Sequence, residues 1–180
     1  FESIMDRAER EHRTDLLTEW FEQASDGPLK STLAMRAVES LRTKSTDDAI
    51  EFLTNVGDAK WRDWDMYWPV AGDLAKRDPQ AALDWIFSLP KFPDEPAPPG
   101  LAAVLQQWHT KEPAAAKDWL LQHTDQLWWP RAARGIADSL NNSGNQQDRD
   151  AFLANFTPEA QLVIKQSWDK PAIRDPKSAQ

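Results

Sequence analysis

The chain of 180 residues contains no cysteine, which excludes disulfides, thiolate zinc sites and cysteine nucleophiles. Its six glycines are scattered, so the sequence predicts no glycine-rich loop that would hold a phosphate. The three histidines form neither an HExxH motif nor another pair at metal-binding spacing. No serine lies in a nucleophile-elbow pattern. We therefore expect a non-enzymatic protein that uses no metal and no cofactor.

Basic residues are also fewer than acidic residues. Lys and Arg number 21 against 29 Asp and Glu, so the formal net charge is −8. Nucleic acids and anionic membranes attract basic surfaces, and the charge argues against both as main partners. No apolar run approaches the roughly 18 residues of a membrane span, so we expect no membrane insertion in this segment. The chain begins with Phe1 rather than Met, and we expect it to derive from a longer parent.

Tryptophan and proline are abundant instead, at ten and thirteen residues. Alternating β-branched runs, the pattern of strands, are few, whereas prolines separate segments with helical periodicity. This composition favours helices joined by proline-marked turns. The sequence therefore predicts an all-α protein.

A short phrase recurs along the chain. RDPQAALDW begins at Arg77, and the similar KEPAAAKDW begins at Lys111, 34 residues later. A period of 20–50 residues is typical of stacked repeats, and the aromatic that ends each phrase is predicted to pack between neighbouring units. Aligned on that aromatic, five copies are spaced 32, 33, 34 and 33 residues apart and end at Trp20, Phe52, Trp85, Trp119 and Phe152.

Each unit is predicted to contain two helices. Asp78 is a suitable N-cap, Pro79 suits the first helical position, and Pro90 ends the helix, while Ser45 is the N-cap of the preceding copy. A small residue lies on the apolar face of each second helix and would let the paired helices approach closely; these residues are Ala49, Ala82 and Ala116. We expect helices near residues 4–24, 29–43, 46–56, 64–76, 79–89, 100–110, 113–124, 130–141, 147–155 and 158–168.

Paired helices at this period resemble tetratricopeptide-like and HEAT-like α-helical repeats. DPQAALDWIFSLP is similar in rhythm to the second helix of a tetratricopeptide unit, but the first helices lack that family's Trp–Leu–Gly–Tyr pattern. The phrase is closer to divergent helical repeats of bacterial proteins, often within larger cell-envelope chains. The resemblance spans about residues 14–168. It implies a right-handed α-solenoid of about five stacked hairpins at 1–168, and it favours the cell envelope over the cytoplasm. The polar, proline-broken end DKPAIRDPKSAQ predicts a flexible tail at 169–180.

The stretch KWRDWDMYW at 60–68 is the most unusual in composition. Trp61, Trp64 and Trp68 recur at i, i+3 and i+7, so a helix would align them on one side, and Tyr67 follows Trp64 by three residues. These aromatics either seal the junctions between stacked units or anchor a partner's side chain, since Trp and Tyr dominate interface hot spots. A second aromatic cluster is predicted at Trp128, next to Trp129.

Two arginines lie one turn apart in the expected helix at 130–141. Arg131 and Arg134 would clamp a carboxylate of a ligand or, alternatively, form ion pairs within the helix or lie on a solvated face. His123 is expected in the last turn of its helix, where the helix dipole favours an imidazolium.

The sequence thus predicts an interaction scaffold that binds a protein or peptide on its concave or aromatic-rich face. The alternative is a carbohydrate- or cell-wall-binding helical scaffold, in which Asp63 and Asp65 would bond sugar hydroxyls beside the tryptophans. A third class is an enzyme with an acidic site that no motif reveals. Carboxylates are so numerous that no particular pair stands out.

Overall fold

A computed structural model describes residues 7, 8, 11, 13–92, 95–142, 144 and 146–166. These residues form ten α-helices and one short 3-10 helix, η1, with no strand among them. The prediction of an all-α protein is confirmed. The tail expected at 169–180 lies outside the described residues, as does the start of the helix expected at 4–24.

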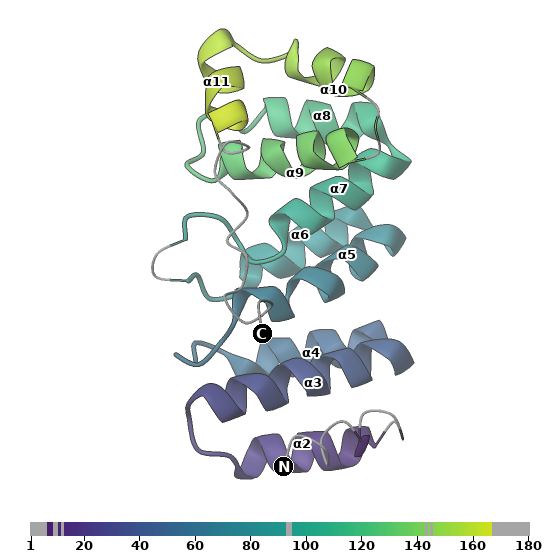
Figure 1. The fold of residues 1–180 in the computed structure, drawn as a ribbon, viewed down its shortest axis with the longest axis vertical. Helices are drawn as coiled ribbons and strands as arrows, with labels where there is room; N and C mark the ends of the chain where they lie inside the picture. Colours follow the sequence, from purple (N-terminus) through teal and green to yellow (C-terminus); the bar gives the residue numbers. More distant parts are fainter. Residues whose placement is uncertain are drawn as a thin grey trace, which may run out of the picture.

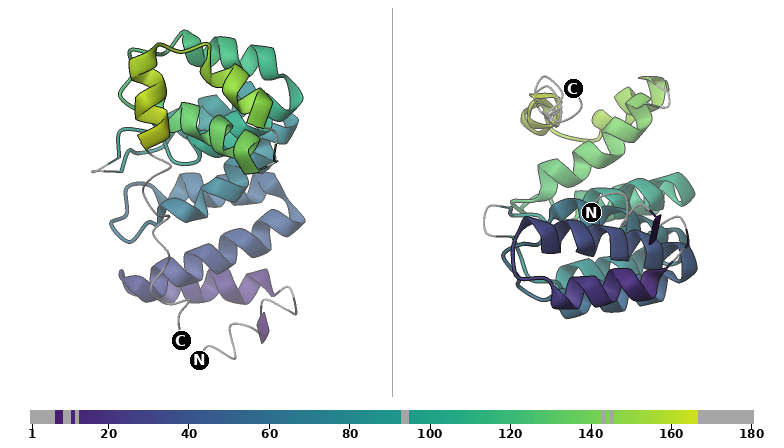
Figure 2. Two further views of the ribbon diagram at one scale, coloured as in Figure 1. Left: turned by 45° about the horizontal axis from the view of Figure 1, so that its top comes forward. Right: turned by 60° about the horizontal axis from the view of Figure 1, so that its bottom comes forward.

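Successive helices are layered along the long axis of the molecule, with α2 at one end and α10 and α11 at the other (Figure 1). The left view of Figure 2 shows the same order. The bounds are α2 (Thr14–Gln23), α3 (Pro28–Lys44), α4 (Thr46–Val56), η1 (Trp64–Met66), α5 (Trp68–Arg77), α6 (Pro79–Ser88), α7 (Leu101–Lys111), α8 (Pro113–Leu121), α9 (Trp129–Asn142), α10 (Gln146–Leu153) and α11 (Pro158–Gln166).

The helices contact one another in the pairs that the repeat predicts. Helix α3 packs on α4, α5 on α6, α7 on α8, and α9 on α10, so that each pair forms one unit. Adjoining units meet through α2 and α3, α4 and α5, α6 and α7, and α8 and α9. In addition, α7 packs against both α5 and α9, and α11 packs against α9. The principal contacts therefore join helices of the same or adjoining units.

The predicted helix caps are present. Ser45 Oγ accepts a hydrogen bond from Asp48 N at 3.2 Å, and Asp78 Oδ1 accepts one from Ala81 N at 3.0 Å. Glu112, the less suitable residue at the equivalent place, forms no side-chain cap. A short polar side chain just before the first turn satisfies an otherwise unpaired amide, which explains why these helices begin where the sequence predicts.

Small residues bring the first helices of three units close together. A Cβ added at Gly72 in α5 would lie 3.7 Å from Ala103 Cβ in α7, which is ordinary contact. A Cβ added at Gly135 in α9 would lie 2.8 Å from Ala102 Cβ and 3.0 Å from its Cα. Gly100, just before α7, has φ +80° and leaves no room for a Cβ beside Ala71. The approach of α7 to α9 therefore requires glycine at 135.

The small residues of the second helices are buried as predicted. Ala49, Ala82 and Ala116 have no exposed surface. Ala49 and Ala82 belong to a core that runs without interruption from Ala34 in α3 to Ile164 in α11, and a smaller cluster packs α2 against α3. The core thus follows the stack.

The five repeat aromatics lie on equivalent helices but pack differently. Phe52 meets Phe21 in the preceding unit with ring centroids 5.0 Å apart, and Trp85 donates from Nε1 to Thr54 Oγ1 of the preceding unit at 3.1 Å. Trp119 stacks instead on Trp128 at 5.5 Å. Trp20 packs against the small cluster of Ala8, Leu17 and Ala37. Phe152 meets the rings of His109 and Phe156 edge to face.

The expected helix at 64–76 is corrected by the structure. Trp61 lies in the preceding turn, Trp64 begins η1, and α5 begins only at Trp68. Asp63 accepts a hydrogen bond from Asp65 N at 2.9 Å and so caps η1 rather than a longer helix. The three tryptophans therefore do not share one helical face.

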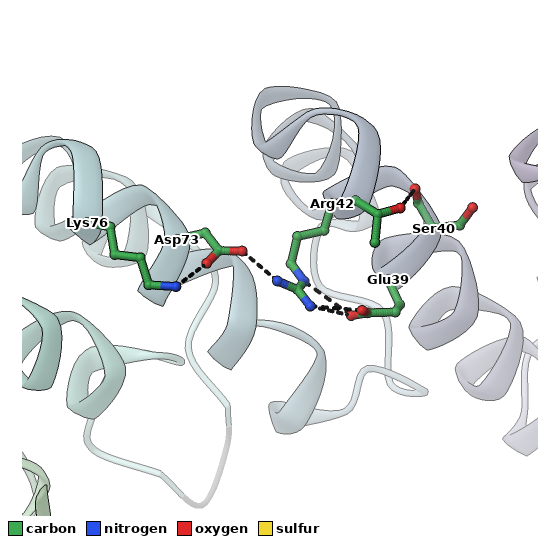
Figure 3. Close-up of polar contacts among 6 residues, drawn as sticks. Glu39, Ser40, Arg42, Asp73 and Lys76 are labelled. Atoms are coloured by element: carbon green, nitrogen blue, oxygen red, sulfur yellow. Dashed lines mark hydrogen bonds and ion pairs between the residues drawn. The ribbon is translucent and has the colours of Figure 1, made fainter. Parts of the chain in front are cut away.

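Charged side chains join α3 to α5 (Figure 3). Arg42 Nη1 contacts Asp73 Oδ2 at 2.6 Å, and its Nη2 contacts Glu39 Oε1 at 2.8 Å. Lys76 Nζ contacts the other Asp73 oxygen at 2.8 Å. Burial alone would raise the pKa of the Asp73 carboxyl, but the hydrogen bonds from Lys76 and Arg42 outweigh burial and lower it. The anionic form of Asp73 therefore stabilises this junction.

We expect Gly135→Ala to lower the free energy of unfolding by about 1–3 kcal/mol, because the new methyl group meets backbone atoms of Ala102. Gly72→Ala is the matched control within a helix. Its methyl group makes ordinary contact, so it should be neutral or stabilising by up to about 1 kcal/mol through helix propensity. Urea denaturation compares the two, and equal effects would contradict the proposed close approach.

We expect Asp73→Asn to lower the free energy of unfolding by about 1 kcal/mol at neutral pH. The pKa of the Asp73 carboxyl in the folded protein lies below its ordinary value of 3.8, so the stabilisation is fully present at pH values above 3.8. The stabilisation is lost as the pH falls through the pKa of Asp73 in the folded protein. Denaturation across this pH range measures the difference from wild type. Asp118→Asn, an exposed change on α8, should show no comparable difference.

Candidate functional site: an aromatic groove at Trp61

Two mainly apolar depressions of the described surface are lined by Trp61. One, of about 460 Å³, is here called the Trp61 groove and lies between the ends of α2 and α4 and the turn at 57–63. Its volume is within the range typical of ligand sites. Its principal lining residues are Phe21, Glu22, Asp26, Lys30, Phe52 and Trp61, and Asn55 and Val56 complete the side formed by α4.

Three aromatic rings from separate segments form the apolar wall of the groove. Phe21 lies 5.0 Å from Phe52 and 5.3 Å from Trp61 between ring centroids, in both cases edge to face. Edge-to-face contacts of this kind stabilise an aromatic cluster beyond the area they bury. The wall is therefore preformed.

Lys30 places its ammonium group against this wall. Lys30 Nζ lies 5.2 Å from the Phe21 ring centroid and 5.9 Å from that of Trp61, within the range of cation–π contact. It also lies 3.5 Å from Asp26 Oδ1, and the side chain is only 19% exposed. The groove thus already holds one positive charge between aromatic faces and a carboxylate.

A second depression adjoins the Trp61 groove. It has a volume of about 470 Å³ and shares Asp26 and Trp61 with the groove. Its other lining residues come from the turn that begins α3 and from Lys60. Trp61 is therefore half-buried and lines both depressions.

Arg62 holds the turn that carries Trp61. Its side chain is only 3% exposed, and Nη2 contacts Asp58 Oδ1 at 2.8 Å. It also donates to the carbonyl oxygens of Ala59, Pro90 and Lys91 at 3.2, 2.9 and 3.3 Å. Its guanidinium lies 4.4 Å from the Phe92 ring centroid. One buried cation thereby joins the turn at 57–63 to the segment after α6.

Tyr67 is buried beside this junction. It has no exposed surface, and its ring meets Phe92 edge to face at 6.0 Å. Burial raises the pKa of the Tyr67 phenol, and the nearby Arg62 guanidinium offsets only part of that rise. Within the described residues the hydroxyl has no hydrogen-bond partner. In this conformation Tyr67 offers no surface to a partner.

Trp64 and Trp68 lie apart from the Trp61 groove, beside Arg131. The Arg131 guanidinium lies 4.7 Å from the Trp64 ring centroid and pairs with Glu95. Trp64 also packs on Phe92 at 5.4 Å, so its ring is part of the junction between units. Trp68 is 42% exposed at the edge of a small recess that it shares with Trp64 and Arg131.

The two arginines do not converge on one site. Arg134 Nε pairs with Asp138 Oδ2, one turn further along α9, at 2.9 Å, whereas Arg131 pairs with Glu95 outside the helix. Each guanidinium thus has a carboxylate of this chain as its partner. The arrangement matches the ion-pair interpretation for Arg134 rather than a shared carboxylate clamp.

The second predicted aromatic cluster is packed into the core. Trp128 and Trp129 are 7% and 3% exposed, and Trp129 Nε1 donates to Leu120 O at 2.8 Å. His123 Nδ1 lies 2.6 Å from Trp119 O, just after α8 ends. These contacts seal the junction between α8 and α9.

Neither a metal centre nor a membrane span is found in the described part of the chain. Its His, Asp and Glu side chains form no group of three or more suited to a metal ion. None of the helices described combines the length and hydrophobicity needed to cross a bilayer. Compared with known proteins, the chain matches no family model, no curated protein and no solved structure.

Several residues of the site were not singled out from the sequence. Four of them have roles that depend on contacts between distant segments: Phe21, Lys30, Arg62 and Phe92. Phe21 alone carried a signal, because it occupies the position after the repeat aromatic, where the other four copies have leucine or isoleucine. An aromatic at that place in one unit marks a departure from the repeated core pattern.

We expect Arg62→Lys to lower the free energy of unfolding by about 1–3 kcal/mol, because one ammonium cannot reach all of the carbonyl oxygens that the guanidinium bonds. Urea denaturation measures the change. Lys60→Gln, an exposed substitution two residues away, should leave the stability unchanged. A stability of Arg62→Lys equal to that of wild type would show that the junction does not depend on the guanidinium.

Proposed function

We propose that this chain is a right-handed α-solenoid of helical hairpins that binds a segment of a partner protein in the Trp61 groove. The principal helix contacts join the same or adjoining units, which is the pattern expected of stacked repeats. Repeat proteins of this architecture commonly present extended binding surfaces. The spacing of the repeat aromatics and the layered order of the helices support the same architecture.

The observation that carries the proposal is the groove itself. It combines a preformed aromatic wall with a few charged groups, and this combination is typical of sites that bind a side chain. Aromatic residues at the centre of a pocket supply most of the binding energy in many interfaces. The groove is open and lies between helix ends, so an extended segment has access to it.

The carbohydrate-binding alternative rests on a different surface. Trp68 is the most exposed tryptophan of the KWRDWDMYW stretch, and Asp65, three residues earlier in the sequence, is also exposed. An exposed indole is suited to stacking on a sugar ring, and an exposed carboxylate is suited to bonding its hydroxyls. Trp68 therefore provides the contrast that separates the two proposals.

Selection from a library of random peptides on the immobilised protein tests the first proposal. We expect Trp61→Ala to weaken the binding of selected peptides by about thirtyfold, the effect of losing a hot-spot tryptophan. Trp68→Ala should leave the same peptides bound. Because Trp61 also packs on Phe21, Asn55→Trp provides a second variant that fills the groove from its exposed edge.

Thermal denaturation confirms that each variant is folded before binding is compared. The proposed function would be overturned if neither Trp61→Ala nor Asn55→Trp changed the affinity for the selected peptides, or if the selection yielded no peptide. Titration with cell-wall glycan fragments, followed by tryptophan fluorescence, tests the alternative. A response abolished by Trp68→Ala and retained by Trp61→Ala would favour the carbohydrate proposal instead.

A further inference from the structure

The Trp61 groove is electrostatically negative at its helical ends. Its lining residues Phe21 and Glu22 belong to the last turn of α2, and Asn55 and Val56 belong to the last turn of α4. The C-terminal end of a helix carries partial negative charge on its unpaired carbonyl groups. Neither α2 nor α4 has a basic residue in its last turn to compensate that charge.

Formal charge adds to this effect where it lies at the groove itself. Asp15 and Asp47 lie in the first turns of α2 and α4, away from the groove, and pair with Arg13 and Arg77. The carboxylates that line the groove are those of Glu22 and Asp26. These two side chains therefore attract a cation to the groove.

Lys30 compensates only part of the negative charge that lines the groove. Its ammonium group pairs with Asp26, so one of the two carboxylates that line the groove is compensated. Glu22 is exposed and forms no ion pair within the described residues. With Glu22 and Asp26 against Lys30, the lining keeps one excess negative charge beside the aromatic wall.

We propose that the Trp61 groove binds an arginine side chain of the partner segment, an inference that rests on the proposed function. The aliphatic part of arginine suits the apolar surface of Phe52 and Val56, and its guanidinium suits the free carboxylate of Glu22. Arginine fits better than lysine because its planar, weakly hydrated cation stacks on aromatic rings and bonds carboxylates in pairs.

The test uses the peptides selected on the wild-type protein. We expect arginine to be enriched among them, and replacement of that arginine by citrulline, its neutral near-isostere, to weaken binding at least tenfold. Replacement by lysine should weaken binding less. Glu22→Gln in the protein should also weaken binding about tenfold, and this variant should bind the arginine and citrulline peptides with similar affinity.

Glu19→Gln is the matched control, because Glu19 carries the same charge on the same helix but does not line the groove. At physiological salt it should change binding less than about twofold. Peptides that depend on Trp61 but are not enriched in arginine, or that bind Glu22→Gln as tightly as wild type, would overturn this inference and leave the proposed function standing. Equal losses for Glu19→Gln and Glu22→Gln would also overturn it, because the charge effect would then be general.

Discussion

The close approach of α7 to α5 and α9 is the constraint on which the rest of the structure depends. Gly135 lies against Ala102, and Gly72 lies against Ala103, so both neighbours pack on small residues of the same helix. Glycine within a helix costs about 1 kcal/mol in propensity relative to alanine. At Gly135 this cost is offset by packing, because an added Cβ would meet Ala102 and move α9 away from α7.

The candidate site depends on this stack through a chain of contacts. The segment after α6 is held where Arg62 can donate to the Pro90 and Lys91 carbonyl oxygens, and Arg62 in turn holds the turn that presents Trp61. A buried guanidinium requires several acceptors in suitable positions, since an unpaired buried charge is strongly destabilising. The wall of the groove is thus set by packing in the middle of the chain as well as by α2 and α4.

The electrostatic character of the groove comes from how helix ends are placed rather than from charge density alone. Acidic residues occur along the whole chain, and most of them are solvated. Glu22 differs because it lies beside an aromatic wall and at the end of a helix with no basic residue in its last turn. In such a setting a carboxylate and the helix dipole act on the same small volume, which favours a cation over a neutral side chain.

The sequence alone determined the all-α class, the positions of most helices and the buried alanines, because capping, periodicity and the repeat are local properties. It placed Trp61 among the candidate residues but joined it to Trp64, Tyr67 and Trp68, since i, i+3 and i+7 spacing implies one helical face. Only the tertiary structure separated them, because η1 interrupts that helix and the rings of Trp64 and Tyr67 pack against Phe92. The groove joins side chains from four segments, and no local pattern encodes which distant segments meet.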